Sequence, residues 1–336
     1  MSSLSPFGVP SSPVAAAYTR RDGRTALELR GKEMKLSGMT AFDGSSWYAQ
    51  GQTAVMASVH GPTTAKNEEH DTCTVHVRVQ HAHARAPAAG GAEKALYEER
   101  KLGLLTRTDA LALESMLEST LNAVFIRERF PRCVLVVDVV VIEDDGSLPA
   151  VALNAVMCTL LDAGLPCRTT MAAVCVAVVT RGGAADSSSG AAQGLLFPGG
   201  SSSAGVAYEY VLDPTRAEES LGAGGASSDS SAAEKAAVAG TDAITTPSEA
   251  PTALGSRSVT QQAQDQYRCV GTGVFVFSNP SCGGGLLAQL VRCAGSVSGV
   301  MPGLGVPVEV YAEMMALAER ASGVIFEFLR QCNVAE

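Results

Sequence analysis

A buried strand, an acidic turn and a buried helix follow one another without a break across residues 133–164. Residues 134–142 are an almost unbroken β-branched run, as expected of a strand covered on both faces. The next three residues, 144–146, read Asp-Asp-Gly, which is a natural turn. Residues 147–162 then read as a helix that starts with Ser-x-Pro and ends before Gly-x-Pro. A strand that enters a helix through so short a turn predicts a layered fold with helices packed on a sheet.

Composition sets limits on the fold and on the binding partners. The chain has 336 residues, 46% of them apolar, so it can bury a sizeable core. It carries 25 basic against 34 acidic residues, a net charge of −9, which argues against tight RNA binding by this chain alone. Nine cysteines without a Cys-x-x-Cys pair predict reduced, buried thiols and no zinc site.

Three stretches of the chain lack the large apolar residues that a folded core needs. Residues 1–19 predict a disordered tail without the features of a secretory signal. Residues 181–205 and 214–266 are rich in Gly, Ser, Ala and Thr, and we expect them to be disordered insertions in loops. Removing these stretches leaves a single domain within residues 20–336, of roughly 240 residues. No apolar run reaches the roughly 20 residues that cross a bilayer.

The remaining sequence predicts an α+β domain. Hydrophobic patterning predicts strands at 27–36, 72–80, 169–179, 206–213 and 270–277, and a hairpin with arms at 45–48 and 53–61. The clean alternation at 72–80 is typical of a half-solvated antiparallel strand. Helical periodicity appears at 108–127, with Thr108 as its N-cap, and at 307–329. Because strands come first and helices then alternate with strands, we expect a mixed sheet packed with helices.

Five segments together resemble the RNase PH family. They are R-R-D-G-R-T-A-L-E-L-R at 20–30, F-D-G-S-S-W-Y-A-Q-G-Q-T-A-V-M-A-S-V-H-G-P at 42–62, D-D-G-S-L-P-A-V-A-L-N-A at 144–155, L-D-A-G-L-P-C-R at 161–168 and V-L-D-P-T at 211–215. The order and spacing are specific, whereas D-G-R alone is not. The resemblance implies the RNase PH fold, which is related to the second domain of ribosomal protein S5.

Within that family the chain looks most similar to ring subunits of the eukaryotic RNA exosome. The resemblance implies a heterohexameric ring of RNase PH-like subunits, S1/KH cap subunits above it, and RNA passing through the pore. It also implies 3′–5′ RNA processing and degradation, including rRNA maturation, in the nucleus and nucleolus and also in the cytoplasm. An acidic subunit fits such a ring if its neighbours supply most of the basic lining.

The resemblance also implies which residues carry the chemistry. Phosphorolysis brings inorganic phosphate against a phosphodiester, so an active subunit needs cations, N–H donors and an acid or metal at the leaving oxygen. Asp138 and Asp144 occupy the places of family aspartates near the scissile bond, and we take them as vestigial catalytic candidates. The family's further acid, two residues after the first, is replaced by Val140.

The groups that grip phosphate in the family are missing here. Its arginine at the start of the helix 108–127 is replaced by Asp109 or Ala110, although Arg107 is close by. The family's Thr-Arg after the acidic turn is Ser147-Leu148 here. An aspartate would repel incoming phosphate by a few kcal/mol at short range in a partly shielded site. We therefore expect a subunit that keeps the fold and lacks phosphorolytic activity, the alternative being an active phosphate-dependent exoribonuclease.

Asp138 and Asp144 also have a structural interpretation. Six residues of extended chain span roughly 20 Å, so only a turn at 143–146 would bring the two carboxylates together. An aspartate in such a turn caps the helix that follows. Capping and a surviving metal or proton role both remain open from the sequence.

Three basic residues, Arg100, Lys101 and Arg107, are candidates for RNA contact because the corresponding exosome loop faces the pore. The plain alternative is a solvated loop. The five histidines have no matching Cys, Asp or Glu pattern, so we predict no metal site. No cofactor is required by the main hypothesis; Mg²⁺ and phosphate belong only to the enzyme alternative. A third hypothesis is an adaptor that binds proteins through its Ser/Gly-rich insertions.

Overall fold

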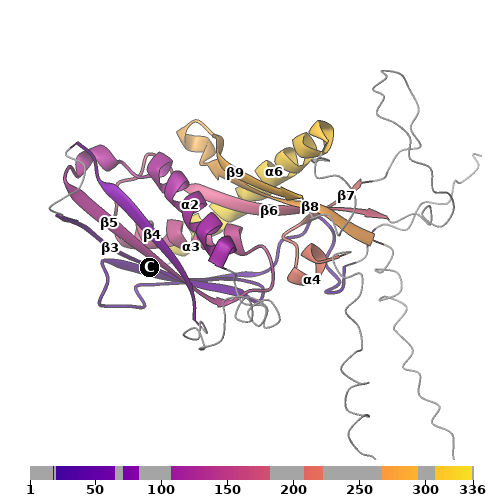
Figure 1. Ribbon diagram of the computed structural model, residues 1–336, viewed down its shortest axis with the longest axis horizontal. Coiled ribbons are helices and arrows are strands. Elements are labelled where there is room, and N and C mark those ends of the chain that lie inside the picture. The colour runs from indigo at the N-terminus through magenta and orange to yellow at the C-terminus, as the bar shows by residue number, and fades with distance from the viewer. Residues whose placement is uncertain are drawn as a thin grey trace, which may run out of the picture.

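The computed structural model describes residues 18, 20–64, 71–82, 107–181, 208–221, 267–293 and 307–334. In this part of the chain, the strands form two sheets with helices packed on them, as Figure 1 shows. The first sheet has the strand order β1-β2-β3-β5-β4, and the second has β7-β6-β8-β9. We expected one mixed sheet, so the sequence prediction was right about the layers and wrong about the number of sheets. One hydrophobic core contains side chains from both.

The first sheet is mixed and contains the predicted hairpin. Its strands are β1 (Lys32–Leu36), β2 (Gly44–Gln50), β3 (Thr53–Thr64), β4 (Thr74–His81) and β5 (Cys133–Glu143). We expected β4 to be antiparallel, which is wrong, because it runs parallel to β5. The reason is the crossover between them, which includes helix α2 (Arg107–Val124) and returns the chain to the starting end of the sheet. Thr108, the expected N-cap, lies inside this helix.

Strand β5 is covered on one face only in the described residues. Leu135, Val137 and Val139 are buried, whereas Val136 and Val140 are partly exposed. The expectation of two covered faces was wrong, because the helices that contact this sheet lie on the side of the buried residues. Asp138 shares the open face with Val136 and Val140.

Helix α3 (Leu148–Asp162) lies between the two sheets. It contacts β2 and β3 of the first sheet and β6 (Met171–Arg181) of the second. Its residues from Ala150 to Leu160 are all buried, as expected of a helix that is apolar all round. Asn154 satisfies the backbone of Ala173, accepting a 2.8 Å hydrogen bond from its N–H and donating a 3.0 Å bond to its carbonyl.

The second sheet is antiparallel and carries the closing helix. Its strands are β6, β7 (Tyr208–Leu212), β8 (Tyr267–Ser278) and β9 (Gly285–Cys293). Helix α6 (Val308–Val334) packs on β6 and β8. The predicted helix at 307–329 is confirmed, and its buried face includes Met314, Ala318, Ala321 and Ile325. Two short 3-10 turns complete the described fold, η1 (Arg127–Arg129) and η2 (Pro280–Cys282).

Two boundaries of the expected disordered stretches are wrong. Residues 214–221 are folded and include the short helix α4 (Arg216–Glu219), which Thr215 caps through a capping box with Glu218. Tyr18 is 6% exposed and packs edge-on against Tyr267, so the expected tail has an ordered residue. The rest of the tail and of both insertions, except Arg181 at the end of β6, lies outside the described residues. None of the helices in the described part has the length and apolar character needed to span a membrane.

Candidate active site at the β5–α3 turn

Asp138 is held by an arginine on the open face of the first sheet. Its direct neighbours in the sheet are Ser58 on β3 and Arg78 on β4. The Arg78 guanidinium donates to both carboxylate oxygens, at 2.7 and 2.9 Å. A bidentate pair of this kind uses one lone pair on each of the two carboxylate oxygens of Asp138.

Asp144 is committed to the turn after β5. Its Oδ1 accepts a 3.0 Å hydrogen bond from the N–H of Gly146, and its Oδ2 accepts one of 3.0 Å from Arg216. Gly146 has φ +91°, and a Cβ there would meet the backbone N of Arg216 at 2.5 Å. Only glycine therefore fits this turn. Asp144 closes the turn through the Gly146 N–H and does not cap α3, whose N-cap residue Ser147 has no side-chain capping bond.

The turn does not bring the two sequence-predicted aspartates together. Strand β5 continues through Glu143, so Asp138 and Asp144 lie six residues apart along an extended strand. At the usual rise this separation is about 20 Å. That figure is an upper bound, because the pairing of β5 with β3 shifts register between Val141 and Glu143.

Asp145 is a third acid that the sequence interpretation passed over. Its carbonyl accepts a 3.0 Å hydrogen bond from Arg30, and its carboxylate lies 3.5 Å from the same guanidinium. Burial raises the pKa of Asp145 above its usual value, although the positive charge of Arg30 works against this. Its place beside Asp144 in the Asp-Asp-Gly turn was a signal that could have found it.

A carboxylate from α4 caps the amino end of α3. Oε1 of Glu219 accepts a 2.8 Å hydrogen bond from the N–H of Ser147, the residue before the helix. Burial raises the pKa of Glu219 from 4.5 to about 7, and the nearby charge of Asp144 adds to the shift. Helix amino ends attract anions, so an internal carboxylate fills this position. Nothing in the local sequence marks Glu219, because it lies 72 residues from Ser147.

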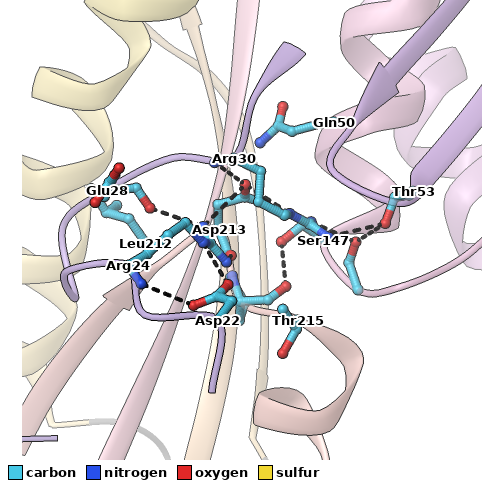
Figure 2. A network of polar contacts seen from close by, with 12 residues as sticks. Asp22, Arg24, Glu28, Arg30, Gln50, Thr53, Ser147, Leu212, Asp213 and Thr215 are labelled. Atoms are coloured by element: carbon cyan, nitrogen blue, oxygen red, sulfur yellow. Dashed lines mark hydrogen bonds and ion pairs between the residues drawn. The ribbon is translucent and has the colours of Figure 1, made fainter. Parts of the chain in front are cut away.

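A buried ion pair ties the turn to the second sheet. Arg30 donates to Oδ1 of Asp213 at 2.7 Å and to Oδ2 at 2.9 Å, and it also donates to the carbonyl of Gly146 at 3.1 Å. Figure 2 shows Arg30 between Asp213 and the turn, with Thr53 on the same side as Ser147. Burial alone would raise the pKa of Asp213, but its hydrogen bonds with Arg30 hold that pKa below the usual value.

A second buried arginine extends this network. Arg20 donates to both oxygens of Glu218, at 2.9 and 2.8 Å, and to the carbonyls of Leu212 and Asp213 at 2.8 and 2.9 Å. The amino-terminal R-R-D-G-R segment therefore has a structural use. It fixes the segment after β7 that carries Glu218 and Glu219 against the β5–α3 turn.

The basic candidates for RNA contact are only partly visible. Arg100 and Lys101 lie outside the described residues, whereas Arg107 is the exposed first residue of α2. Asp109, in the first turn of that helix, pairs with Arg292 of β9 at 3.3 Å. Sequence reasoning missed this arginine, since it lies 183 residues away.

In the described part of the chain, no three His, Cys, Asp or Glu side chains gather as metal ligands would. The acids at the turn are instead bound to arginines or to backbone N–H groups. What the turn can do chemically, as it stands, is hold α3 and α4 together through charge-assisted hydrogen bonds.

Comparison with known proteins agrees with the sequence resemblance. Residues 28–166 match the family model RNase PH, described as the 3′ exoribonuclease family, domain 1. The chain is 30% identical over 168 residues to the exosome complex exonuclease RRP46 homolog of Arabidopsis thaliana, covering 48% of this chain and 61% of that protein. It is 31% identical over 156 residues to the exosome complex component Rrp41 of Nitrosopumilus maritimus, covering 46% and 60%. The chain thus spans about 60% of the length of these relatives.

Solved structures share the fold. Rice (Oryza sativa) Rrp46 superposes with a TM-score of 0.54 at 21% identity, over 93% of this chain and 98% of that one. A chain of the Archaeoglobus fulgidus exosome with RNA bound to the active site gives 0.52 at 14% identity, over 92% and 91%. At these identities the comparison speaks for the fold alone.

Proposed function

We propose that this chain is a structural, non-catalytic subunit of an RNA exosome core, because residues 28–166 match the RNase PH model of the 3′ exoribonuclease family. It pairs with other RNase PH-like subunits in a heterohexameric ring, below S1/KH cap subunits. The ring channels RNA for 3′–5′ processing and degradation, including rRNA maturation. The complex works in the nucleus, the nucleolus and the cytoplasm.

Two findings support the assembly. The curated relatives are named as exosome subunits. The net charge of −9 also favours a chain that shares RNA with more basic neighbours rather than one that grips it alone.

The observation that carries the non-catalytic part is the bond from the Ser147 N–H to Glu219. A phosphate-binding pocket needs free N–H donors and cations, and the amino end of a helix is a ready-made place for it. Here that end holds a carboxylate, whose charge would repel an incoming phosphate when it is ionised. The cations beside it, Arg30 and Arg216, are bonded to Asp213 and Asp144.

Mg²⁺ does not fit the described acids. A magnesium site needs oxygen ligands arranged around one point, with several positions left for water. Asp138 lies within β5 and Asp144 lies six residues later, after the strand has ended, and each is paired with an arginine. No catalytic step through the metal follows from this arrangement.

The alternative is an active phosphate-dependent 3′–5′ exoribonuclease. What favours it is the survival of Asp144 and Asp145 at the turn, where burial raises the pKa of Asp145 above its usual value. Full-length chain with 3′-labelled RNA, Mg²⁺ and phosphate separates the two hypotheses. Our proposal expects no nucleoside diphosphate. Release that Asp144→Ala abolishes and Arg168→Ala preserves would establish the enzyme.

Ring membership has its own test, which also addresses the adaptor hypothesis. Native mass spectrometry of the affinity-purified particle should find several similar chains near stoichiometric ratio. A free-standing adaptor would instead appear alone or with unrelated proteins. That outcome would remove the exosome proposal whatever the activity assay gives.

A further inference from the structure

An open cavity of about 340 Å³ lies between the outer strand β7 and the first turns of α6. It is far in sequence from the β5–α3 turn and takes no part in the network there. Its lining residues are Tyr208, Tyr210, Pro307, Glu309, Val310 and Glu313.

The chemistry of this cavity suits a cation. Tyr208 and Tyr210 alternate on one face of β7, and Glu309 and Glu313 are one turn apart on one face of α6. The Tyr210 hydroxyl hydrogen-bonds to Glu313, and burial raises the pKa of this tyrosine. Aromatic faces and carboxylates both attract positive charge, and no lysine or arginine is among the lining residues.

The backbone beside the cavity is prepared for another strand. The N–H of Leu212 points away from β6 and donates to the carbonyl of Ala26 at 2.8 Å, while the N–H of Asp213 turns back to Cys175. Because backbone direction alternates along a strand, the N–H and C=O of Tyr208 and Tyr210 point the same way as those of Leu212. In the described residues β7 is the outer strand of its sheet, so these groups face no neighbouring strand there.

We propose that β7 and this cavity bind an extended segment of a partner protein that carries arginine or lysine at alternate positions. The segment adds to the sheet by hydrogen-bonding to the backbone of Tyr208 and Tyr210. It extends the row of backbone bonds along β7 that starts at Ala26. Its basic side chains enter the cavity, where they lie beside the tyrosine rings and the carboxylates of Glu309 and Glu313. The same negative charge rejects nucleic acid and acidic peptides at this surface.

The test uses the full chain and a defined peptide probe. A fluorescein-labelled Val-Arg-Thr-Arg-Val peptide with blocked ends presents two arginines on one face of a strand. Fluorescence anisotropy should show binding at least tenfold tighter than for the same peptide with citrulline in place of arginine. A third peptide, methylated on the backbone nitrogens that face β7, should lose binding to a similar degree, because it cannot pair with the edge.

Charge-removing variants on α6 complete the test. Glu309→Gln with Glu313→Gln should weaken binding of the arginine peptide at least tenfold and leave binding of the citrulline peptide unchanged. The matched control, Glu319→Gln with Glu327→Gln, removes the same charge from exposed positions of the same helix and should bind as the wild type does. The proposal is overturned if both double variants weaken binding equally, or if arginine and citrulline peptides bind alike. Circular dichroism on both variants verifies that α6 is intact.

Discussion

The carboxylate of Glu219 accepts a 2.8 Å hydrogen bond from the backbone N–H of Ser147 at the amino end of α3. The two residues lie in connections that leave different sheets. Ser147 follows β5 of the first sheet, and Glu219 ends the short helix after β7 of the second. The contact therefore joins the connections of the two sheets and places a carboxylate at the amino end of α3.

The first prediction concerns stability against pH. The pKa of Glu219 is raised from 4.5 to about 7, so the folded chain holds this proton more tightly than the unfolded chain does. The stabilisation is complete below about pH 4.5 and is lost as the pH rises through 7. Between these values the free energy of unfolding should fall by an amount on the order of 2 kcal/mol.

Glu219→Gln isolates this contribution, because its amide oxygen still accepts from Ser147 and no longer titrates. Urea unfolding from pH 4.5 to 7.5 at constant ionic strength should give a flatter profile for this variant than for the wild type. Glu319→Gln, on the exposed face of α6, should keep the wild-type profile. Parallel profiles for all three proteins would contradict the assignment.

The second prediction concerns phosphate. Since Glu219 fills the amino end of α3 and Asp109 lies in the first turn of α2, millimolar phosphate should raise the melting temperature no more than chloride of equal ionic strength. Differential scanning fluorimetry measures this directly. A phosphate-specific rise that Arg107→Ala abolishes would mean that a working anion pocket exists.

The third prediction concerns the buried pair of Arg30 and Asp213. Arg30→Ala leaves a carboxylate buried without its partner and should cost about 3–5 kcal/mol of unfolding free energy. Adding Asp213→Asn to that variant should recover part of the loss. By contrast, Arg168→Ala breaks a surface pair with Glu128 and should cost at most about 1 kcal/mol. Equal losses of unfolding free energy for Arg30→Ala and Arg168→Ala would show that the buried network stabilises the chain no more than a surface ion pair does.

The fourth prediction compares two glycines with positive φ. Gly164→Ala meets no atom within 4 Å at φ +63°, so it should cost about 1 kcal/mol from backbone strain alone. Gly146→Ala has φ +91° and also drives a Cβ to 2.5 Å from the backbone of Arg216, so it should cost about 3 kcal/mol. Chemical denaturation of both variants measures the difference. A Gly146→Ala chain as stable as Gly164→Ala would show that the α4 segment moves aside freely.

Features set by neighbouring residues were predictable from sequence. The hairpin with arms at 45–48 and 53–61, the strand–turn–helix around β5 and the helix at 307–329 are local patterns, and the structure confirms them. The family resemblance supplied the fold, and the matched region 28–166 bears it out.

Features set by distant residues were missed. The parallel pairing of β4 with β5 depends on the crossover through α2. The alternation of apolar and polar residues along one strand gives no information about the direction of its neighbour. At the candidate site, Arg216 and Glu219 meet the turn from 72 residues away. Asp138 and Asp144 were seen, but their arginine partners were not, so the sequence could not tell bound acids from free ones.

The separation of Arg30 from Asp213 has a consequence for synthesis on the ribosome. At usual elongation rates the 183 residues between them take roughly 10–40 s to translate, and during this interval the first sheet can form before the arginine meets Asp213. The hydrogen bonds that hold the turn after β5 can be complete only when the chain has grown past Glu219. A nascent chain stalled before that point would expose the junction of the two sheets without these hydrogen bonds. We expect a chaperone or a protease to bind an incomplete chain at this junction.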